Sequence, residues 1–276
     1  MKLGPQAGPQ TAFLSSSADI AIYGGAGGAG KTFGLILETI RHLEVPDFSA
    51  VIFRREMPQI RNPGGLWDTA GPIYRQLGGR PNAQGASWRF PAGSIVKMAH
   101  LQLEDDKTSW DGAQIALICF DELQHFSESQ FWYLQSRNRS TCGVRPYTRA
   151  ACNPDADSWL RSLLDWWIGP DGFPVPERSG ILRWFLRVGV EVQWVDGWIP
   201  EALSLTFVPA HVRDNPALLS IDPGYLSRLQ ALESTERARL LHGNWNAKPD
   251  IRGRIYSAFQ PEKHFLSHER AKILER

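Results

Sequence analysis

Residues 25–32 read Gly-Ala-Gly-Gly-Ala-Gly-Lys-Thr, and this stretch decides the fold. It fits the pattern GxxxxGK[ST], in which glycines let successive backbone N–H groups point at phosphate oxygens. A short apolar run at 20–23 precedes it, and a segment with helical apolar spacing at 33–43 follows it. A strand, a glycine turn and a helix in this order predict a phosphate-binding loop at the positive end of a helix dipole.

The glycines at 25–30 also fit the dinucleotide fingerprint GxGxxG. That alternative expects an acidic residue about 20 positions further on, at the end of the second strand. Arg54 and Arg55 stand there instead, which disfavours NAD, although an arginine would suit NADP. Lys31 and Thr32 have no role under this interpretation, so the phosphate loop of a nucleoside triphosphatase is favoured and an NADP oxidoreductase is the alternative.

The composition indicates one large α/β domain. The chain has 276 residues, of which 42% are hydrophobic, and 30 basic against 29 acidic residues give a net charge of +1. Whole-chain charge therefore does not support a nucleic-acid partner, and a DNA footprint would have to be a local patch. No signal peptide and no apolar run of about 18 residues is evident, which predicts a soluble, intracellular protein. Three cysteines cannot all form disulfide bonds with one another.

The rest of the chain alternates strand and helix signals. The continuous apolar run at 115–120 is typical of a strand covered on both faces, and Ser127 with Gln130 forms a capping box that opens a helix through about residue 139. The first 18 residues are expected to be a lead-in without regular structure. Further strands are predicted at 50–53, 94–101 and 147–152, an alternating stretch at 183–194, and a last helix at 223–241. This order predicts a mostly parallel sheet flanked by helices.

Asp121 and Glu122 directly follow the apolar strand and match the Walker B pattern. Asp121 is expected to hold Mg²⁺ together with the Thr32 hydroxyl, while Lys31 reaches the β- and γ-phosphates. Glu122 can accept a proton from the attacking water. The patterns that a guanine-specific enzyme would show, NKxD and a DxxG after the metal strand, are missing, so an ATPase is favoured. The predicted nucleotide contacts are Gly25, Gly27, Gly28, Ala29, Gly30, Lys31 and Thr32.

These motifs resemble the ATPase domain of the large terminase subunit of tailed bacteriophages, from about residue 10 to residue 245. Beyond the Walker motifs, the order of the later segments carries the resemblance: Arg54-Arg55, Ser136-Arg-Asn-Arg139, Asn153-Pro154, Asp214-Asn-Pro216 and Gly243-Asn-Trp245. It implies a RecA-like, additional-strand fold with a small C-terminal lid. The implied division is a lead-in with an adenine contact at 1–18, the ATPase core at 19–169, a lid and linker at 170–246, and a linker at 247–276 toward an absent nuclease domain.

The resemblance also implies roles for single residues. Gln10 corresponds to an adenine-reading glutamine, with Gln6 as the alternative, and Asn153 falls in a motif that senses loss of the γ-phosphate. An arginine finger is missing from the phosphate loop and from 109–113. Arg137 and Arg139 are candidates to act on a neighbouring subunit, although they equally fit cations at a helix C-terminus.

The implied function is ATP hydrolysis with Mg²⁺ that drives double-stranded viral DNA into a procapsid. The implied partners are a homo-oligomeric ring on the capsid portal and a small terminase subunit, in the host cytoplasm and without a membrane. No DNA cleavage is expected from this chain. A helicase or recombination ATPase and a non-catalytic, nucleotide-dependent assembly module are the alternatives.

Overall fold

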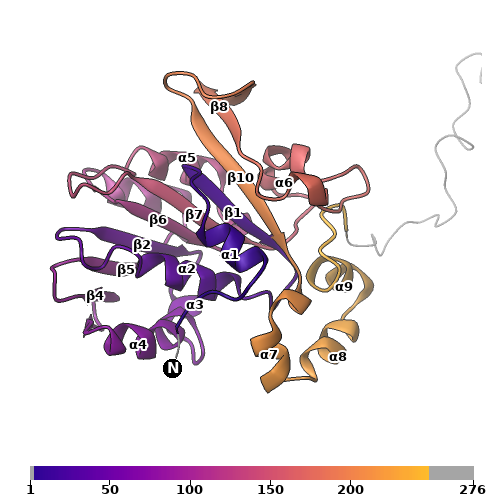
Figure 1. Cartoon of the computed structure of the whole chain (residues 1–276), viewed down its shortest axis with the longest axis horizontal. Coiled ribbons are helices and arrows are strands. Elements are labelled where there is room, and N and C mark those ends of the chain that lie inside the picture. Colours follow the sequence, from indigo (N-terminus) through magenta and orange to yellow (C-terminus); the bar gives the residue numbers. More distant parts are fainter. Residues whose placement is uncertain (1–2, 249–276) are drawn as a thin grey trace, which may run out of the picture.

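The computed structural model describes residues 3–248, which form one ten-stranded sheet covered by helices on both faces (Figure 1). Six central strands are parallel and run in the order β5-β2-β6-β7-β1-β10. Their bounds are Ile95–His100, Ser49–Arg54, Leu117–Asp121, Tyr147–Cys152, Ile20–Gly25 and Leu203–Ala210. β7 lies between β1 and β6, so a strand separates the glycine loop from the acidic pair. This arrangement confirms the RecA-like, additional-strand α/β prediction.

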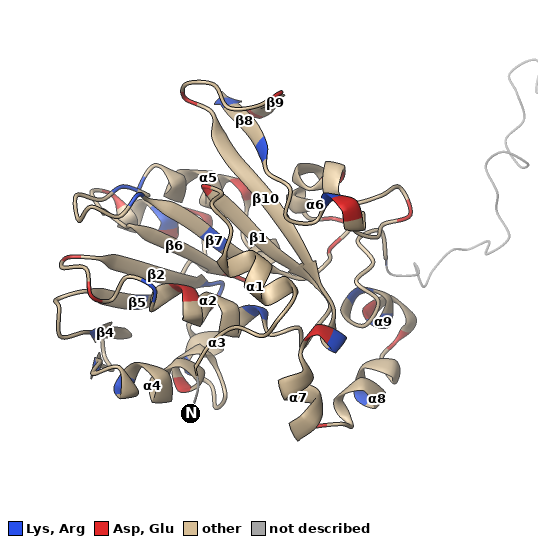
Figure 2. Cartoon of the chain, in the orientation of Figure 1, with Lys and Arg blue, Asp and Glu red and all other residues tan. Residues whose placement is uncertain are grey.

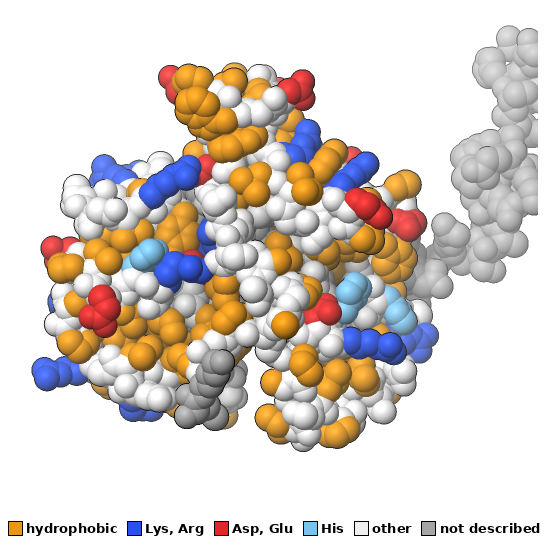
Figure 3. Space-filling model, in the orientation of Figure 1, with side chains coloured by type: hydrophobic (Ala, Val, Ile, Leu, Met, Phe, Trp, Pro, Cys, Tyr) orange, Lys and Arg blue, Asp and Glu red, His pale blue; other side chains and the backbone are white. Residues whose placement is uncertain are grey.

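Antiparallel strands extend the sheet at both ends. β3 (Arg80–Asn82) and β4 (Ser87–Arg89) adjoin β5, while β8 (Arg183–Val188) and β9 (Glu191–Val195) adjoin β10. The β8–β9 hairpin projects from the body, and hydrophobic side chains gather on it (Figure 3). β8, β9 and β10 belong to this sheet. All three lie within residues 170–246, the segment predicted to form a lid and linker.

Two apolar cores separate the sheet from its helices. One, around Phe13, Leu35 and Trp88, is covered by the helices of the first 80 residues. The other, around Phe120 and Trp245, is covered by helices from 104 onward. The helices are α1 (Pro9–Leu14), α2 (Lys31–Thr39), α3 (Met57–Arg61), α4 (Leu66–Gln76), α5 (Glu128–Gln135), α6 (Trp159–Leu163), α7 (Pro216–Ile221), α8 (Tyr225–Gln230) and α9 (Ser234–Leu240), with short 3-10 turns at Glu104–Trp110, Leu123–His125, Asp165–Trp167, Pro176–Arg178 and Val212–Asp214.

Several predicted boundaries were wrong. The lead-in holds α1, because Pro9 presets the first helical turn and Phe13 stacks on Tyr23 with ring centroids 5.0 Å apart. α2 and α5 stop four residues before their predicted ends. The helix predicted at 223–241 is two helices, because the backbone of Glu233 is not helical (ψ 154°). β10 was missed, since its alternating polar residues and Pro209 hide a central strand.

Charges of both signs are scattered over the same elements (Figure 2), as the near-zero net charge leads one to expect. Among the described residues, no helix has both the length and the apolar character needed to cross a membrane.

Candidate active site

The predicted site residues meet at the carboxyl edge of the parallel strands. β1 leads into the glycine loop, β2 ends at Arg54, β6 ends at Asp121 and β7 runs into Asn153. Neighbouring parallel strands place their carboxyl ends side by side, so these distant segments enclose one cavity. Its volume is about 660 Å³, and its lining includes loop residues 27–32, Arg54, Glu122, Asn153, Asn215, Leu218, Tyr225 and Leu240.

The loop conformation depends on glycine at two positions. Gly25 has a φ of 135°, and a Cβ atom there would lie 2.1 Å from the carbonyl oxygen of Ala210 on β10. Gly28 has a φ of 74°, and its Cβ would lie 2.4 Å from Cε1 of Tyr225 on α8. Side chains at these positions would be strained and would also collide with neighbours. The loop is therefore shaped jointly by its own sequence and by later parts of the chain.

Lys31, the first residue of α2, is buried beneath the loop. Its Nζ donates hydrogen bonds to the carbonyl oxygens of Gly25 (3.1 Å) and Ala26 (2.5 Å). Burial lowers the pKa of Lys31, while nearby Glu122 opposes that change. Because the ammonium donates to neutral carbonyls here, an incoming anion could replace them without breaking a salt bridge.

Thr32, Asp121 and Arg54 form a polar cluster beside Lys31. The Thr32 hydroxyl lies 3.1 Å from both carboxylate oxygens of Asp121. Arg54 donates to Oδ2 of Asp121 from Nε at 2.8 Å and approaches it with a second nitrogen at 2.5 Å. Burial raises the pKa of the Asp121 carboxyl, and the Arg54 charge opposes that rise. Arg54, at the end of β2, thus faces the site.

Thr32 and Asp121 fit a magnesium ion. A hydroxyl and a carboxylate are the hard oxygen ligands that Mg²⁺ prefers, and Mg²⁺ commonly takes one or two protein ligands and fills the rest with water and phosphate. Within the described part of the chain, no group of three or more His, Cys, Asp or Glu residues is placed to hold a metal by itself. The donor set therefore suits a cation delivered together with phosphates.

Glu122 is held in an uncommon conformation. It has a φ of 61° and a ψ of 54°, a left-handed backbone that costs a residue with a side chain roughly 1–2 kcal/mol. Its Oε2 accepts hydrogen bonds from Asn153 Nδ2 (2.5 Å) and Gln124 Nε2 (2.6 Å). Gln124 also accepts from the backbone N–H of Asn153 at 3.0 Å. The predicted pair Glu122 and Asn153 is thus brought together, and Gln124, unassigned in the sequence, orients both.

Gln10 is buried next to the loop and is hydrogen-bonded at both ends of its amide. Its Nε2 donates to the Gly30 carbonyl at 2.9 Å, and its Oε1 accepts from the Gln6 backbone N–H at 2.8 Å. Gln6 donates from its amide to Asn215 Oδ1 at 2.7 Å, and Asn215 donates to the Gly28 carbonyl at 2.7 Å. Both glutamines therefore border the loop, and their role toward adenine stays a prediction.

Arg137 and Arg139 lie away from this cavity. Arg137 forms a salt bridge with Asp111 (3.2 Å), and Arg139 donates to the carbonyls of Gly112 and Ala113. These partners precede β6, at the edge of the sheet opposite the glycine loop. Neither arginine is placed to reach the phosphate loop of its own chain. Their predicted action on a neighbouring subunit is not tested by these contacts.

The helices α7–α9 contribute contacts that had no local signal in the sequence. The Gly27 N–H donates to the Leu240 carbonyl at 2.7 Å, and Tyr225 and Leu218 pack on Gly28. Asn215 lies in a segment quoted for the resemblance, although no role was assigned to it. Only the path of the chain brings these residues, about 200 positions later, onto the loop.

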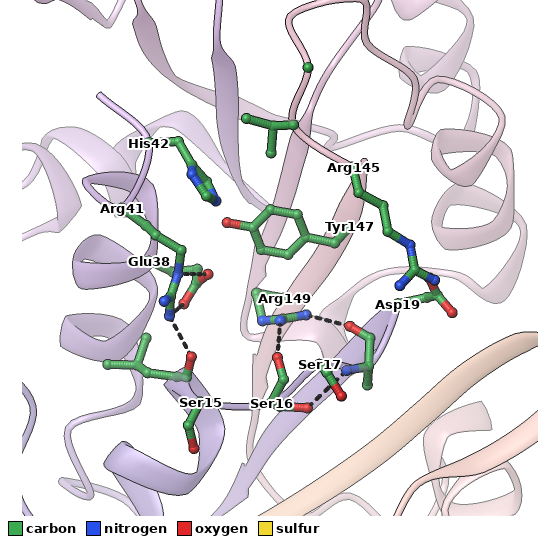
Figure 4. A pocket seen from close by; sticks show the side chains of 14 residues that line it. Ser15, Ser16, Ser17, Asp19, Glu38, Arg41, His42, Arg145, Tyr147 and Arg149 are labelled. Carbon is green, nitrogen blue, oxygen red and sulfur yellow. Dashed lines mark hydrogen bonds and ion pairs between the residues drawn. The ribbon is translucent and has the colours of Figure 1, made fainter. Parts of the chain in front are cut away.

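A second cavity, of about 500 Å³, lies at the opposite edge of the sheet (Figure 4). There Arg149 donates to the carbonyls of Ser16, Ala18 and Thr148, and Glu38 pairs with Arg41. These bonds hold the segment before β1 against β7, so the charged groups at this cavity stabilise the fold.

The sheet order, the glycine loop and the acidic pair define a P-loop nucleoside-triphosphatase fold with an additional strand. The chain belongs to the terminase large subunit family: the family described as "Terminase large subunit, T4likevirus-type, N-terminal" matches residues 22–262. This membership leaves no support for the oxidoreductase alternative.

Solved structures share the fold at low sequence identity. The large terminase of a thermophilic bacteriophage aligns with a TM-score of 0.61 and 15% identity over 88% of this chain and 54% of that one. The large terminase ATPase domain of Thermus phage P74-26 aligns with a TM-score of 0.55 and 14% identity, over 86% of this chain and 93% of that one. The chain thus spans about half of the first relative and nearly all of an ATPase domain. No curated protein matches the chain by sequence.

Proposed function

We propose that this chain hydrolyses ATP and so drives double-stranded DNA into a viral procapsid. The observation that carries the proposal is the Glu122 carboxylate, held by Asn153 and Gln124 beside Lys31, Thr32 and Asp121. A related large terminase has been solved in complex with ADP and with ATP-gamma-S, which supports a nucleotide as the ligand. The family membership supports DNA packaging as the work that hydrolysis drives.

Each residue has a defined part in the proposed reaction. Lys31 exchanges its two carbonyl acceptors for β- and γ-phosphate oxygens, and the loop N–H groups bind the same phosphates. Thr32 and Asp121 hold Mg²⁺, which when bound neutralises charge on the phosphates. Glu122 accepts a proton from the attacking water and aligns that water with the γ-phosphorus. Asn153 fixes the direction of the Glu122 carboxylate.

Arginines at two places in the fold have a part in the proposed function. Arg54 lines the cavity and already contacts Asp121, which supports a part on the phosphate side for this residue rather than a contact with DNA. Arg137 and Arg139 face the opposite edge of the sheet, so their proposed action would be on the site of an adjacent copy in a ring. An arginine supplied in this way can raise turnover about 10³-fold or more.

The proposed function also implies partners for the chain. The motor would act as a homo-oligomeric ring on the capsid portal, together with a small terminase subunit, in the cytoplasm of the infected cell. The predicted linker at 247–276 lies almost wholly outside the described residues. That this chain does not cleave DNA is a prediction, which incubation with plasmid DNA and Mg²⁺ would check.

Glu122→Gln tests the proposed chemistry. The amide keeps the size of the side chain but cannot accept the proton, so we expect turnover to fall about 10²- to 10⁴-fold with nucleotide affinity retained. ATP turnover and binding of a fluorescent ATP analogue measure the two quantities. Lys31→Ala is the matched control, in which binding and turnover are both lost. Equal turnover in wild type and Glu122→Gln would favour a non-catalytic assembly module.

A further inference from the structure

Two consecutive residues of α9 contact two different parts of the site. The carbonyl of Leu240 accepts a 2.7 Å hydrogen bond from the N–H of Gly27 in the phosphate loop. Arg239 Nε donates a 2.8 Å hydrogen bond to the carbonyl of Pro154, in the turn that follows β7. α9 therefore connects the loop with that turn.

Arg239 is held firmly on the turn. Its guanidinium forms a 3.0 Å ion pair with Glu236 and lies 3.7 Å from Asp155, and only 24% of its side chain is exposed. Contacts with two carboxylates and one carbonyl limit the orientations that the guanidinium can adopt. Arg239 thus has three partners, and two of them, Glu236 and Asp155, support its contact with Pro154.

The same turn also holds the general base. Pro154 directly follows Asn153, whose side chain donates to Glu122 Oε2 and whose backbone N–H donates to Gln124. The Glu122 carboxylate accepts hydrogen bonds from Asn153 and Gln124, so its direction depends on these neighbours. A small displacement of the Pro154 carbonyl would move the adjacent Asn153 and, through its hydrogen bond, the Glu122 carboxylate.

We propose that Arg239 is a positioning residue, which couples occupancy of the phosphate loop to the orientation of Glu122 through the Asn153–Pro154 turn. The proposal rests on the proposed ATPase function. A phosphate that accepts from the Gly27 N–H competes with the Leu240 carbonyl for the same donor. Its arrival therefore displaces the end of α9, and Arg239 transmits that displacement to the turn.

Steady-state kinetics of five variants test the proposal. Arg239→Ala is expected to lower kcat about 10- to 100-fold with KM for ATP nearly unchanged, since misplacing a catalytic group by about 1 Å has effects of this size. Arg239→Lys, which can still donate to Pro154, restores part of the loss. Arg237→Ala, on the same helix but bonded to the Gln230 carbonyl, leaves kcat unchanged.

The remaining variants ask whether Arg239 acts through Asn153. Because both residues would serve one function, Asn153→Ala combined with Arg239→Ala should lose no more turnover than Asn153→Ala alone. Losses that multiply in the double variant, or a raised KM with kcat preserved in Arg239→Ala, would overturn the proposal in favour of a merely structural contact.

Amide hydrogen exchange tests the proposed coupling independently of turnover. A wild type without any turnover would refute the ATPase function itself, but exchange would still report whether the loop and the turn are coupled. ADP binding should change exchange over residues 153–157 in the wild type, and this change should vanish in Arg239→Ala. Either no change in the wild type or the same change in both proteins would contradict the coupling.

Discussion

The two edges of the parallel sheet both bury charged groups, yet they bond them in different ways. At the carboxyl edge, Lys31 donates only to two carbonyls of a glycine loop, and Asp121 shares its oxygens between Thr32 and Arg54. At the opposite edge, Arg149 donates to three carbonyls of the segments it joins, and Glu38 binds Arg41 with both oxygens. The first set suits replacement by phosphate and metal, whereas the second suits permanent structure.

Arg149→Leu should produce the largest change in stability. The variant leaves the carbonyls of Ser16 and Ala18 without their buried donor, and each unpaired group costs about 1–3 kcal/mol, so we expect a loss of about 3 kcal/mol in the free energy of unfolding. Urea denaturation measures this loss. ATP turnover per folded molecule should stay within two-fold of wild type. Unchanged stability, or a selective loss of turnover, would remove the distinction between the edges.

Arg54→Ala should change the pH dependence of turnover. Burial raises the pKa of Asp121 and Arg54 opposes the rise, so removing Arg54 raises this pKa further. Metal binding needs the carboxylate, so turnover is present above this pKa and is lost as the pH falls through it. In the variant the loss of turnover should therefore begin at a higher pH than in the wild type.

The control for Arg54 is Arg55→Ala. Arg55 donates to the Leu101 carbonyl and to Gln130 rather than to Asp121, so its removal should leave the acidic limb of the pH–rate profile in place. If Arg54→Ala and Arg55→Ala both gave the wild-type profile, Arg54 would not tune the carboxylate of Asp121 that is proposed to bind the metal.

Arg145→Ala should have the smallest effect. Arg145 pairs with Asp19 at the rim of the second cavity, but 70% of its side chain is exposed to water. Exposed ion pairs contribute about 0–1 kcal/mol, and Asp19 keeps its hydrogen bonds from the backbone and hydroxyl of Ser204. Thermal unfolding should show a loss below about 1 kcal/mol. A loss of stability as large as that of Arg149→Leu would mean that the Arg145–Asp19 ion pair also stabilises this edge of the sheet.

Much of the site could be predicted because its motifs are local. The glycine loop, the acidic pair and Asn153 each lie at the carboxyl end of a strand, and parallel strands bring these ends together whatever the loops between them. The strand runs at 20–23, 50–53 and 115–120 were visible because strands buried on both faces are continuously apolar. β10 and α1 were missed since their buried residues alternate with polar ones or fill less than two helical turns.

By itself, the sequence located the candidate phosphate loop, the candidate metal-binding aspartate and the candidate catalytic glutamate, because backbone conformation and residue type decide these over a few positions. Only the tertiary structure decided which arginine faces that loop. Arg54 does, at the end of β2, while Arg137 and Arg139 lie at the far edge. It also placed Tyr225 and α9 on the glycines, because such contacts depend on the path of the whole chain rather than on any local pattern.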